Sequence, residues 1–252
     1  MVTIFSHCTV RVVEMNTSSL IEQVDDLKRD EHDAFFSDAC FIALYSLLML
    51  TGFVYLVRSP VSYITWFVSP FIGLFISDAL SSILHWSVDT WGSMNTPILG
   101  RNIRSFRQHH MYPSLMAHHD FVETNGQNCI AAIPVIAASL LIVENWCSMA
   151  CILFWTSLAV ASTNQIHVWA HRPVDSSLGW MIRLLQRWRI ILEPHHHKQH
   201  HKTHVVAYGI TNGWSDVVLE PIFKRLEPII AKYLKVDPRS NDEALRAIAH
   251  PR

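Results

Sequence analysis

The chain has 252 residues, a formal net charge of −1 and only 16% charged residues, whereas soluble domains usually contain about 25%. Half of the residues are hydrophobic, so the polar sequence is too short to cover four buried helices in water. The composition therefore argues against a large soluble protein and favours an integral membrane protein.

Residues 1–34 read as a polar N-terminal tail, because they contain "DDLKRDEHD" and have no apolar centre. Four uncharged, apolar runs follow, at residues 39–57, 60–77, 126–143 and 145–165. Each run is about as long as a helix must be to cross roughly 30 Å of hydrocarbon. We therefore predict an all-α integral membrane helical bundle with about four transmembrane helices.

Short connections join these runs in pairs, at "RSP" (58–60) and at Glu144-Asn145. Two such hairpins leave the N-terminus, residues 85–125 and everything after 165 on one side of the membrane. Nine basic residues between residues 85 and 204 fall on that side: Arg101, Arg104, Arg107, Arg172, Arg183, Arg187, Arg189, Lys198 and Lys202. Since positively charged loops tend to stay inside, we expect that side to be cytosolic.

After the last run, residues 176–192, "SSLGWMIRLLQRWRIIL", alternate apolar and basic residues at helical spacing. This pattern is typical of a basic amphipathic helix that lies in the membrane interface. A surface helix of a globular region is the alternative.

Histidines are concentrated where the predicted spans end. Thirteen of the sixteen lie between residues 85 and 204, and none sits in the middle of a predicted span. Under the predicted topology they meet at one cytosolic face. We therefore expect a histidine-rich helical cap on that side of the bundle.

Helical spacing groups these histidines further, because positions i, i+4 and i+7 share a face. The aligned sets are Asp78, His85 and Asp89; Asn164, His167 and His171; His196 and His200; and His197 and His201. Pro194 suits the first position of a helix through the last two pairs. Adjacent histidines point about 100° apart, so this segment is able to serve two metal ions, or one ion and the groups around it.

Imidazole nitrogen suits zinc, copper, iron and nickel. One zinc ion takes three or four protein ligands, so ten or so histidines at one face fit two ions better than one. The sequence lacks HExxH, which argues against a zinc protease. A metal transporter or metal store is a further alternative, but transport needs polar ligands near the bilayer centre, where only Asp78 comes close.

Carboxylates and amides near the histidines are candidates for a supporting layer. We interpret Asp78 as a hydrogen-bond acceptor that orients His85, because an ionisable group in a span is costly and usually paired. A direct metal ligand and a purely structural contact between helices are the alternatives. Asp89, Asp120 and Asn164 are further candidates for residues that contact the metal ligands.

Four ordered blocks between about Asp78 and Trp214 make the sequence recognisable: "HWSVDTWGS", "FRQHHMYPSLMAHHDFVETNGQN", "TNQIHVWAH" and "LEPHHHKQHHKTH...YGITNGW". They resemble the Kua family of membrane lipid desaturases, whose animal members are plasmanylethanolamine desaturases. The resemblance implies a histidine-ligated centre of two iron ions at the endoplasmic reticulum membrane. It also implies that O2 and electrons from cytochrome b5 convert an alkyl ether phospholipid into its vinyl ether, a plasmalogen.

The resemblance also implies a set of metal ligands, and it leaves out His118 and His195. The implied ligands are His85, His109, His110, His119, His167, His171, His196, His197, His200, His201 and His204. We accordingly expect a transmembrane lipid desaturase domain at 35–215 and a cytosolic or interfacial tail at 216–252.

The main alternative is another di-iron enzyme, an acyl-lipid desaturase or hydroxylase, since plant relatives of the family act on acyl lipids. Arg104 or Arg107 are candidates to meet a phosphate head group, or to form a basic patch that faces the cytochrome. We expect no nucleic-acid partner.

Overall fold

A computed structural model describes residues 17–113, 119–172, 177–236 and 238–239. These residues form eight helices and no strand, so the predicted all-α class is confirmed. The helices are α1 (Thr17–Arg58), α2 (Tyr63–Thr90), α3 (Gly100–Met111), α4 (Phe121–Ile142), α5 (Cys147–His171), α6 (Gly179–Arg187), α7 (Pro194–Thr203) and α8 (Asp216–Leu234).

The chain divides into two units, Met1–Ser37 and Asp38–Arg252. In the first unit the described residues form the start of α1, so the second half of the predicted polar tail is helical from Thr17 onward. Residues 1–16 lie outside the described part. All further features belong to the second unit.

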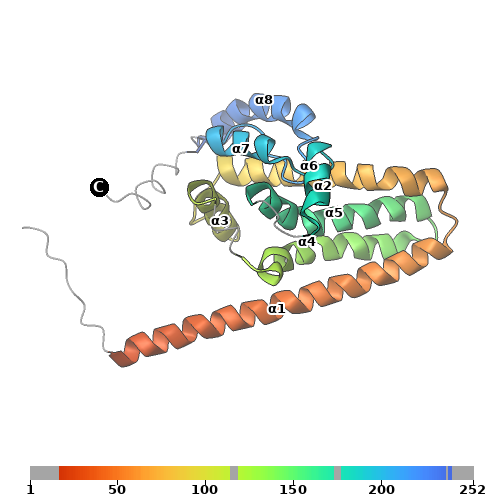
Figure 1. The fold of residues 1–252 in the computed structure, drawn as a ribbon. Helices are drawn as coiled ribbons and strands as arrows, with labels where there is room; N and C mark the ends of the chain where they lie inside the picture. The colour runs from red at the N-terminus through yellow and green to blue at the C-terminus, as the bar shows by residue number, and fades with distance from the viewer. Residues whose placement is uncertain (1–16, 114–118, 173–176, 237, 240–252) are drawn as a thin grey trace, which may run out of the picture. The chain divides into compact units, whose positions relative to one another are not determined.

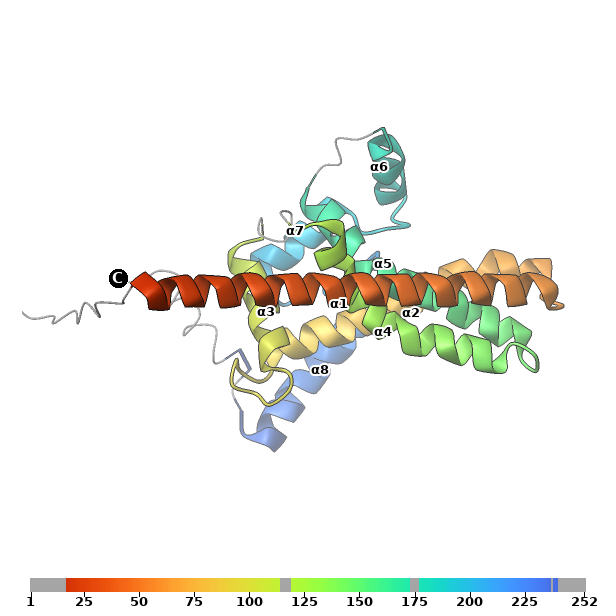
Figure 2. The same ribbon diagram turned by 90° about the horizontal axis from the view of Figure 1, so that it is seen from below.

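Among the described residues, four helical segments are long and apolar enough to cross a membrane: Phe35–Arg58, Tyr63–Thr90, Phe121–Ile142 and Cys147–His171. This confirms the four predicted spans and a multi-pass membrane protein. Helices α2, α4 and α5 lie side by side (Figures 1 and 2). At the start of α2, Tyr63, Ile64 and Phe67 are 94, 76 and 72% exposed, which suits contact with lipid and would be unfavourable in water.

Small residues let these helices approach closely. A Cβ atom at Gly73 of α2 would lie 2.7 Å from the backbone nitrogen of Thr156 in α5, so the two backbones touch there. Between α4 and α5, the hydroxyl of Ser157 donates to the carbonyl of Ala132, and that of Ser139 donates to the carbonyl of Ala150. Small side chains and hydroxyl bonds of this kind hold helices together in membranes.

Helices α2 and α5 continue beyond their apolar runs, and the extensions carry histidines. The last carbonyls of a helix have no partner inside the helix. At the end of α2 the buried Arg107 supplies one, because its Nε donates to the carbonyl of Val88 at 3.2 Å and its Nη2 donates to those of Asp89, Trp91 and Gly92. Arg107 therefore caps α2, and of the two candidate head-group arginines only Arg104 is exposed.

Helix α6 lies within residues 176–192, where a basic amphipathic helix was predicted. Ile182 is buried, and Gln186 anchors the helix by donating to the carbonyl of Trp169 near the end of α5. Trp180 and Trp188 are exposed. In both views α6 runs across the direction of the long helices (Figures 1 and 2).

Helix α8 packs against the extension of α2. Phe223 stacks on Trp86, with ring centroids 4.5 Å apart and planes 2° apart. Tyr208, from the segment between α7 and α8, completes this small core. The segment after α7 and helix α8 therefore lie beside the histidine-bearing end of α2.

Candidate metal centre

In the part of the chain that the structure describes, two groups of side chains are each able to hold a metal ion. In each group one possible ligand atom per residue lies within 4.8 Å of all the others. The five-histidine group contains His109, His167, His171, His197 and His201. The Asp89 group contains His85, Asp89, His110 and His200.

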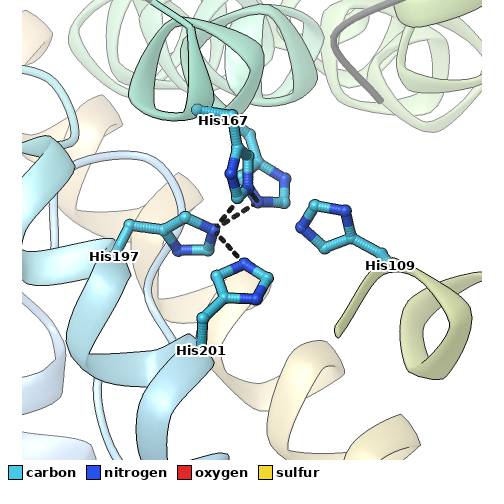
Figure 3. A group of neighbouring side chains, drawn as sticks. His109, His167, His197 and His201 are labelled. Carbon is cyan, nitrogen blue, oxygen red and sulfur yellow. Dashed lines mark hydrogen bonds between the residues drawn. The ribbon is translucent and has the colours of Figure 1, made fainter. Parts of the chain in front are cut away.

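In the five-histidine group, the Nε2 atom of His197 is the centre of the arrangement (Figure 3). It lies 2.7 Å from the Nε2 of His167, 2.8 Å from that of His171 and 2.9 Å from that of His201. His109 enters from α3 and faces the same point from the opposite side (Figure 3). Both of its ring nitrogens are buried and have no hydrogen-bond partner among the described residues.

The Asp89 group combines three imidazoles with one carboxylate. The Nε2 of His110 lies 3.0 Å from that of His200 and 3.4 Å from that of His85. The Oδ2 of Asp89 lies 3.3, 3.7 and 3.4 Å from the Nε2 atoms of His85, His110 and His200. His85 and His200 are fully buried, and Asp89 is 4% exposed.

The two groups are neighbours, because adjacent residues of one helix contribute to different groups. On α3, His109 belongs to the first and His110 to the second. On α7, His201 belongs to the first and His200 to the second, with ring centroids 5.9 Å apart. The predicted pair His197 and His201 does share one group, whereas of the predicted pair His196 and His200 only His200 belongs to a group.

Burial keeps four of these imidazoles neutral. It lowers the pKa of His109 to about 3 and that of His201 to about 2, and repulsion from neighbouring histidines adds to both shifts. Burial followed by the same repulsion also holds the pKa of His110 and that of His197 well below the usual value. Only the neutral ring offers a lone pair to a metal, so these four rings are in the metal-binding form at neutral pH.

The donor set fits a metal ion on chemical grounds. A proton between two Nε2 atoms satisfies one pair of rings, whereas His197 faces three other rings at once. One cation satisfies all of the converging lone pairs together. Imidazole with carboxylate is a set that iron, zinc and copper accept.

Several residues predicted from the sequence lie outside both groups. The His119 side chain is 45% exposed and pairs with Glu123 at 3.5 Å. His196 pairs with Asp216 at 2.9 Å, and this hydrogen bond raises the pKa of His196. His204 ends α7 and stacks on His110, with ring centroids 4.5 Å apart, so it lies beside the Asp89 group.

The predicted supporting residues also have definite partners. Asp120 caps α4, because its carboxylate accepts the N–H of Glu123. Asn164 donates to the carbonyl of Thr124, which ties α5 to α4. Asp78 does not bond to His85 and instead accepts hydrogen bonds from the segment 211–215. Asp89, predicted as a supporting residue, belongs to one of the two groups itself. Its i, i+4 spacing from His85 was the sequence signal for that position.

Comparison with known proteins identifies the family. The model of the lipid desaturase domain matches residues 74–241. The chain belongs to the lipid desaturase family. The match includes both groups and α8, and it extends past residue 215, where the sequence analysis places the domain boundary. Together with the histidine groups, it indicates a metal centre in this lipid desaturase.

Individual relatives are similar over most of the chain. Plasmanylethanolamine desaturase 1 of Mus musculus is 37% identical over 68% of this chain, and plasmanylethanolamine desaturase of Myxococcus xanthus is 37% identical over 70%. Each alignment spans 66% of the relative's own length. The chloroplastic fatty acid desaturase 4 of Arabidopsis thaliana is 29% identical over 69% of this chain and 54% of its own length. No solved structure matches this chain.

Proposed function

We propose that this protein is a membrane di-iron plasmanylethanolamine desaturase. It removes one hydrogen atom from each of the first two carbons of the alkyl chain, counted from the ether oxygen. This leaves the vinyl ether of a plasmalogen. The balance requires one O2, two electrons and two protons, and it yields two molecules of water. The 37% identity to plasmanylethanolamine desaturases from an animal and a bacterium supports this choice of substrate.

The observation that carries the proposal is the pair of adjacent groups. Protein side chains cannot oxidise an unactivated CH2 group, so a bound metal must supply that chemistry with O2. We propose that the five-histidine group binds one iron ion and the Asp89 group binds the other. Asp89 is thereby assigned as a ligand, while His119, His196 and His204, which the family resemblance implies as ligands, belong to neither group and are not assigned to either ion.

The protein's own contribution is to hold the ligands and to keep water away. His85, His197 and His200 are at most 1% exposed, so their ring nitrogens meet little solvent. Exclusion of water from such a site prevents side reactions and strengthens its electrostatic interactions. The apolar faces of α2, α4 and α5 are the surfaces available for the hydrocarbon chain of the lipid, and the exposed Arg104 is a candidate to meet its head group.

We propose the endoplasmic reticulum membrane as the location, with both groups on the cytosolic side. The distribution of arginine and lysine described above supports this orientation. Cytochrome b5 on that side would supply the electrons. Both groups lie at the ends of α2 and α5, beyond the apolar runs, where a soluble domain of an electron donor can approach.

The decisive experiment measures lipids in cells that lack plasmanylethanolamine desaturase activity. Expression of this protein should restore vinyl-ether phospholipids, and the purified protein should contain about two irons per chain. His171→Ala should abolish the activity, because it removes a ligand candidate of the five-histidine group. New double bonds in acyl chains without any vinyl ether would favour the acyl-lipid alternative, which the similarity to the Arabidopsis protein suggests.

A further inference from the structure

The sequence block "YGITNGWSD" (residues 208–216) has no role in the proposed chemistry, and none of its side chains belongs to either group. In the structure its backbone wraps around one carboxylate, that of Asp78. The Oδ1 of Asp78 accepts the N–H groups of Thr211, Asn212 and Gly213 at 2.9–3.1 Å. Its Oδ2 accepts the N–H and the hydroxyl of Ser215 at 2.9 and 2.6 Å.

This enclosure of Asp78 is close and complete. The side chain is fully buried, and a carboxylate that accepts five hydrogen bonds can replace the water it gives up. Gly209 lies directly against it, since a Cβ atom there would be 2.7 Å from both carboxylate oxygens. Gly213 has a φ of 77°, a backbone conformation that glycine adopts without strain.

Tyr208 of this block and Val206 just before it hold two rings of the Asp89 group. The Nδ1 of His85 lies 2.9 Å from the carbonyl oxygen of Tyr208, and the Nδ1 of His200 lies 2.8 Å from that of Val206. A carbonyl only accepts, so each Nδ1 must carry the proton. The Nε2 lone pair of each ring is then left to face the Asp89 group.

The five-histidine group has no comparable support on its α7 side. The Nδ1 atoms of His197 and His201 are buried and have no hydrogen-bond partner among the described residues. The rings of that group are held by packing and by one another. The two groups therefore differ in how firmly their rings are oriented.

A second carboxylate fastens the other side of the segment to α2. Asp216 accepts the N–H of Gly209 at 3.0 Å and the hydroxyl of Ser82 at 3.1 Å. The backbone from Tyr208 to Ser215 is thus held against α2, the helix that carries His85 and Asp89, while the carbonyl of Val206 contacts His200 of α7.

We infer that Asp78 is a positioning residue, and that with residues 206–216 it fixes the tautomer and orientation of His85 and His200. The inference rests on the proposed metal-binding role of the Asp89 group. Residues that orient metal ligands through hydrogen bonds commonly change metal affinity by about 10- to 100-fold when they are replaced. Asp78 should therefore control one of the two metal sites and leave the other unchanged.

Asp78→Asn tests this directly. Asparagine keeps the shape, but its NH2 group must face N–H donors, because both oxygens of Asp78 accept only from donors. With Co²⁺ alone as the probe and a competing chelator, the wild-type protein should bind two ions. In Asp78→Asn the dissociation constant of one ion should rise about 10- to 100-fold. The absorption bands of that ion should change, and those of the second should not.

Two further variants separate this role from a general loss of structure. Asp38→Asn is the matched control. Asp38 is also a buried carboxylate in a span, but Gln127 donates to its Oδ1 and can donate to the asparagine oxygen equally. It should bind both ions as the wild type does. Gly209→Ala pushes a methyl group against Asp78, so it should weaken the same site, and it should add little in the Asp78→Asn background.

If Asp78→Asn cannot be recovered in a folded state, Ser215→Ala takes its place, since it removes only one of the five donors and should weaken the same site less. The inference is overturned if the variant used, Asp78→Asn or Ser215→Ala, binds both ions as the wild type does. It is also overturned if the variant weakens both sites equally. Failure of the proposed function has a different signature: the wild type then forms no vinyl-ether lipid even if it binds two ions.

Discussion

Acid should destabilise the metal-free protein, and His109 gives the effect a magnitude. Its pKa is 6.5 in an unfolded chain and about 3 in the folded protein. Because the folded pKa is the lower one, the unfolded state binds more protons between these values, and stability falls as the pH falls. The contribution of His109 is therefore fully present above about pH 6.5 and is lost progressively toward pH 3.

Between pH 7 and pH 5 the loss from His109 alone is about 2 kcal/mol, since one pKa unit corresponds to about 1.4 kcal/mol. His201, with a pKa of about 2, acts in the same direction. A domain is usually stable by only about 5–15 kcal/mol, so this is a large share. A clear drop in the unfolding temperature is expected over two pH units.

The assay is thermal unfolding in detergent micelles after metal removal with a chelator, compared with protein to which metal has been returned. The bound metal should raise the unfolding temperature and reduce its dependence on pH, because protons must then compete with the ion. An unfolding temperature of the metal-free protein that does not change between pH 7 and pH 5 would refute the argument, because it would mean that these histidines remain accessible to protons when folded.

Three other predictions concern single residues. His171→Ala should remove one metal ion and the activity, whereas His119→Ala should keep the wild-type metal content, as measured by elemental analysis. Loss of metal in His119→Ala would show instead that His119 is a ligand. Gly73→Ala should lower the unfolding temperature by an amount equivalent to about 1–3 kcal/mol, because its methyl group meets the α5 backbone. Arg107→Ala should lower stability by about 2 kcal/mol or more, since it leaves buried carbonyls without a donor; Arg104→Ala, at an exposed position, should not change the unfolding temperature.

The four spans could be predicted because their signal is local. An uncharged run of about 20 residues has few stable alternatives to a membrane-spanning helix. The histidine pairs could be predicted for the same reason, since helical spacing alone puts His197 and His201 on one face. The same spacing extended the second and fourth helices to Asp89 and His171, whereas the Arg107 cap that ends α2 depends on a tertiary contact and had no local signal.

The assignment of each histidine to a group depends on contacts between segments far apart in the chain. His196 and His200 share a face of α7, yet His200 joins the Asp89 group while His196 turns to Asp216, which comes from the start of α8. No periodicity indicates that choice. The partner of His196 is set by the packing of α8 on α2, and α8 lies in the region 216–252 that was predicted to be a tail.

The sequence correctly indicated that the carboxylate of Asp78 is paired, but the predicted partner, His85, was wrong. A carboxylate in a span signals a costly, satisfied group, and its seven-residue spacing from His85 suggested a direct bond. Instead it accepts hydrogen bonds from the backbone of residues 211–215, more than 130 residues away, and the carbonyl of the nearby Tyr208 accepts a hydrogen bond from Nδ1 of His85. Burial of this carboxylate is tolerable only if the segment closes around it, so formation of the enclosure and orientation of the ring are parts of one folding event. That coupling is the reason for expecting Asp78→Asn to act on metal binding as well as on stability.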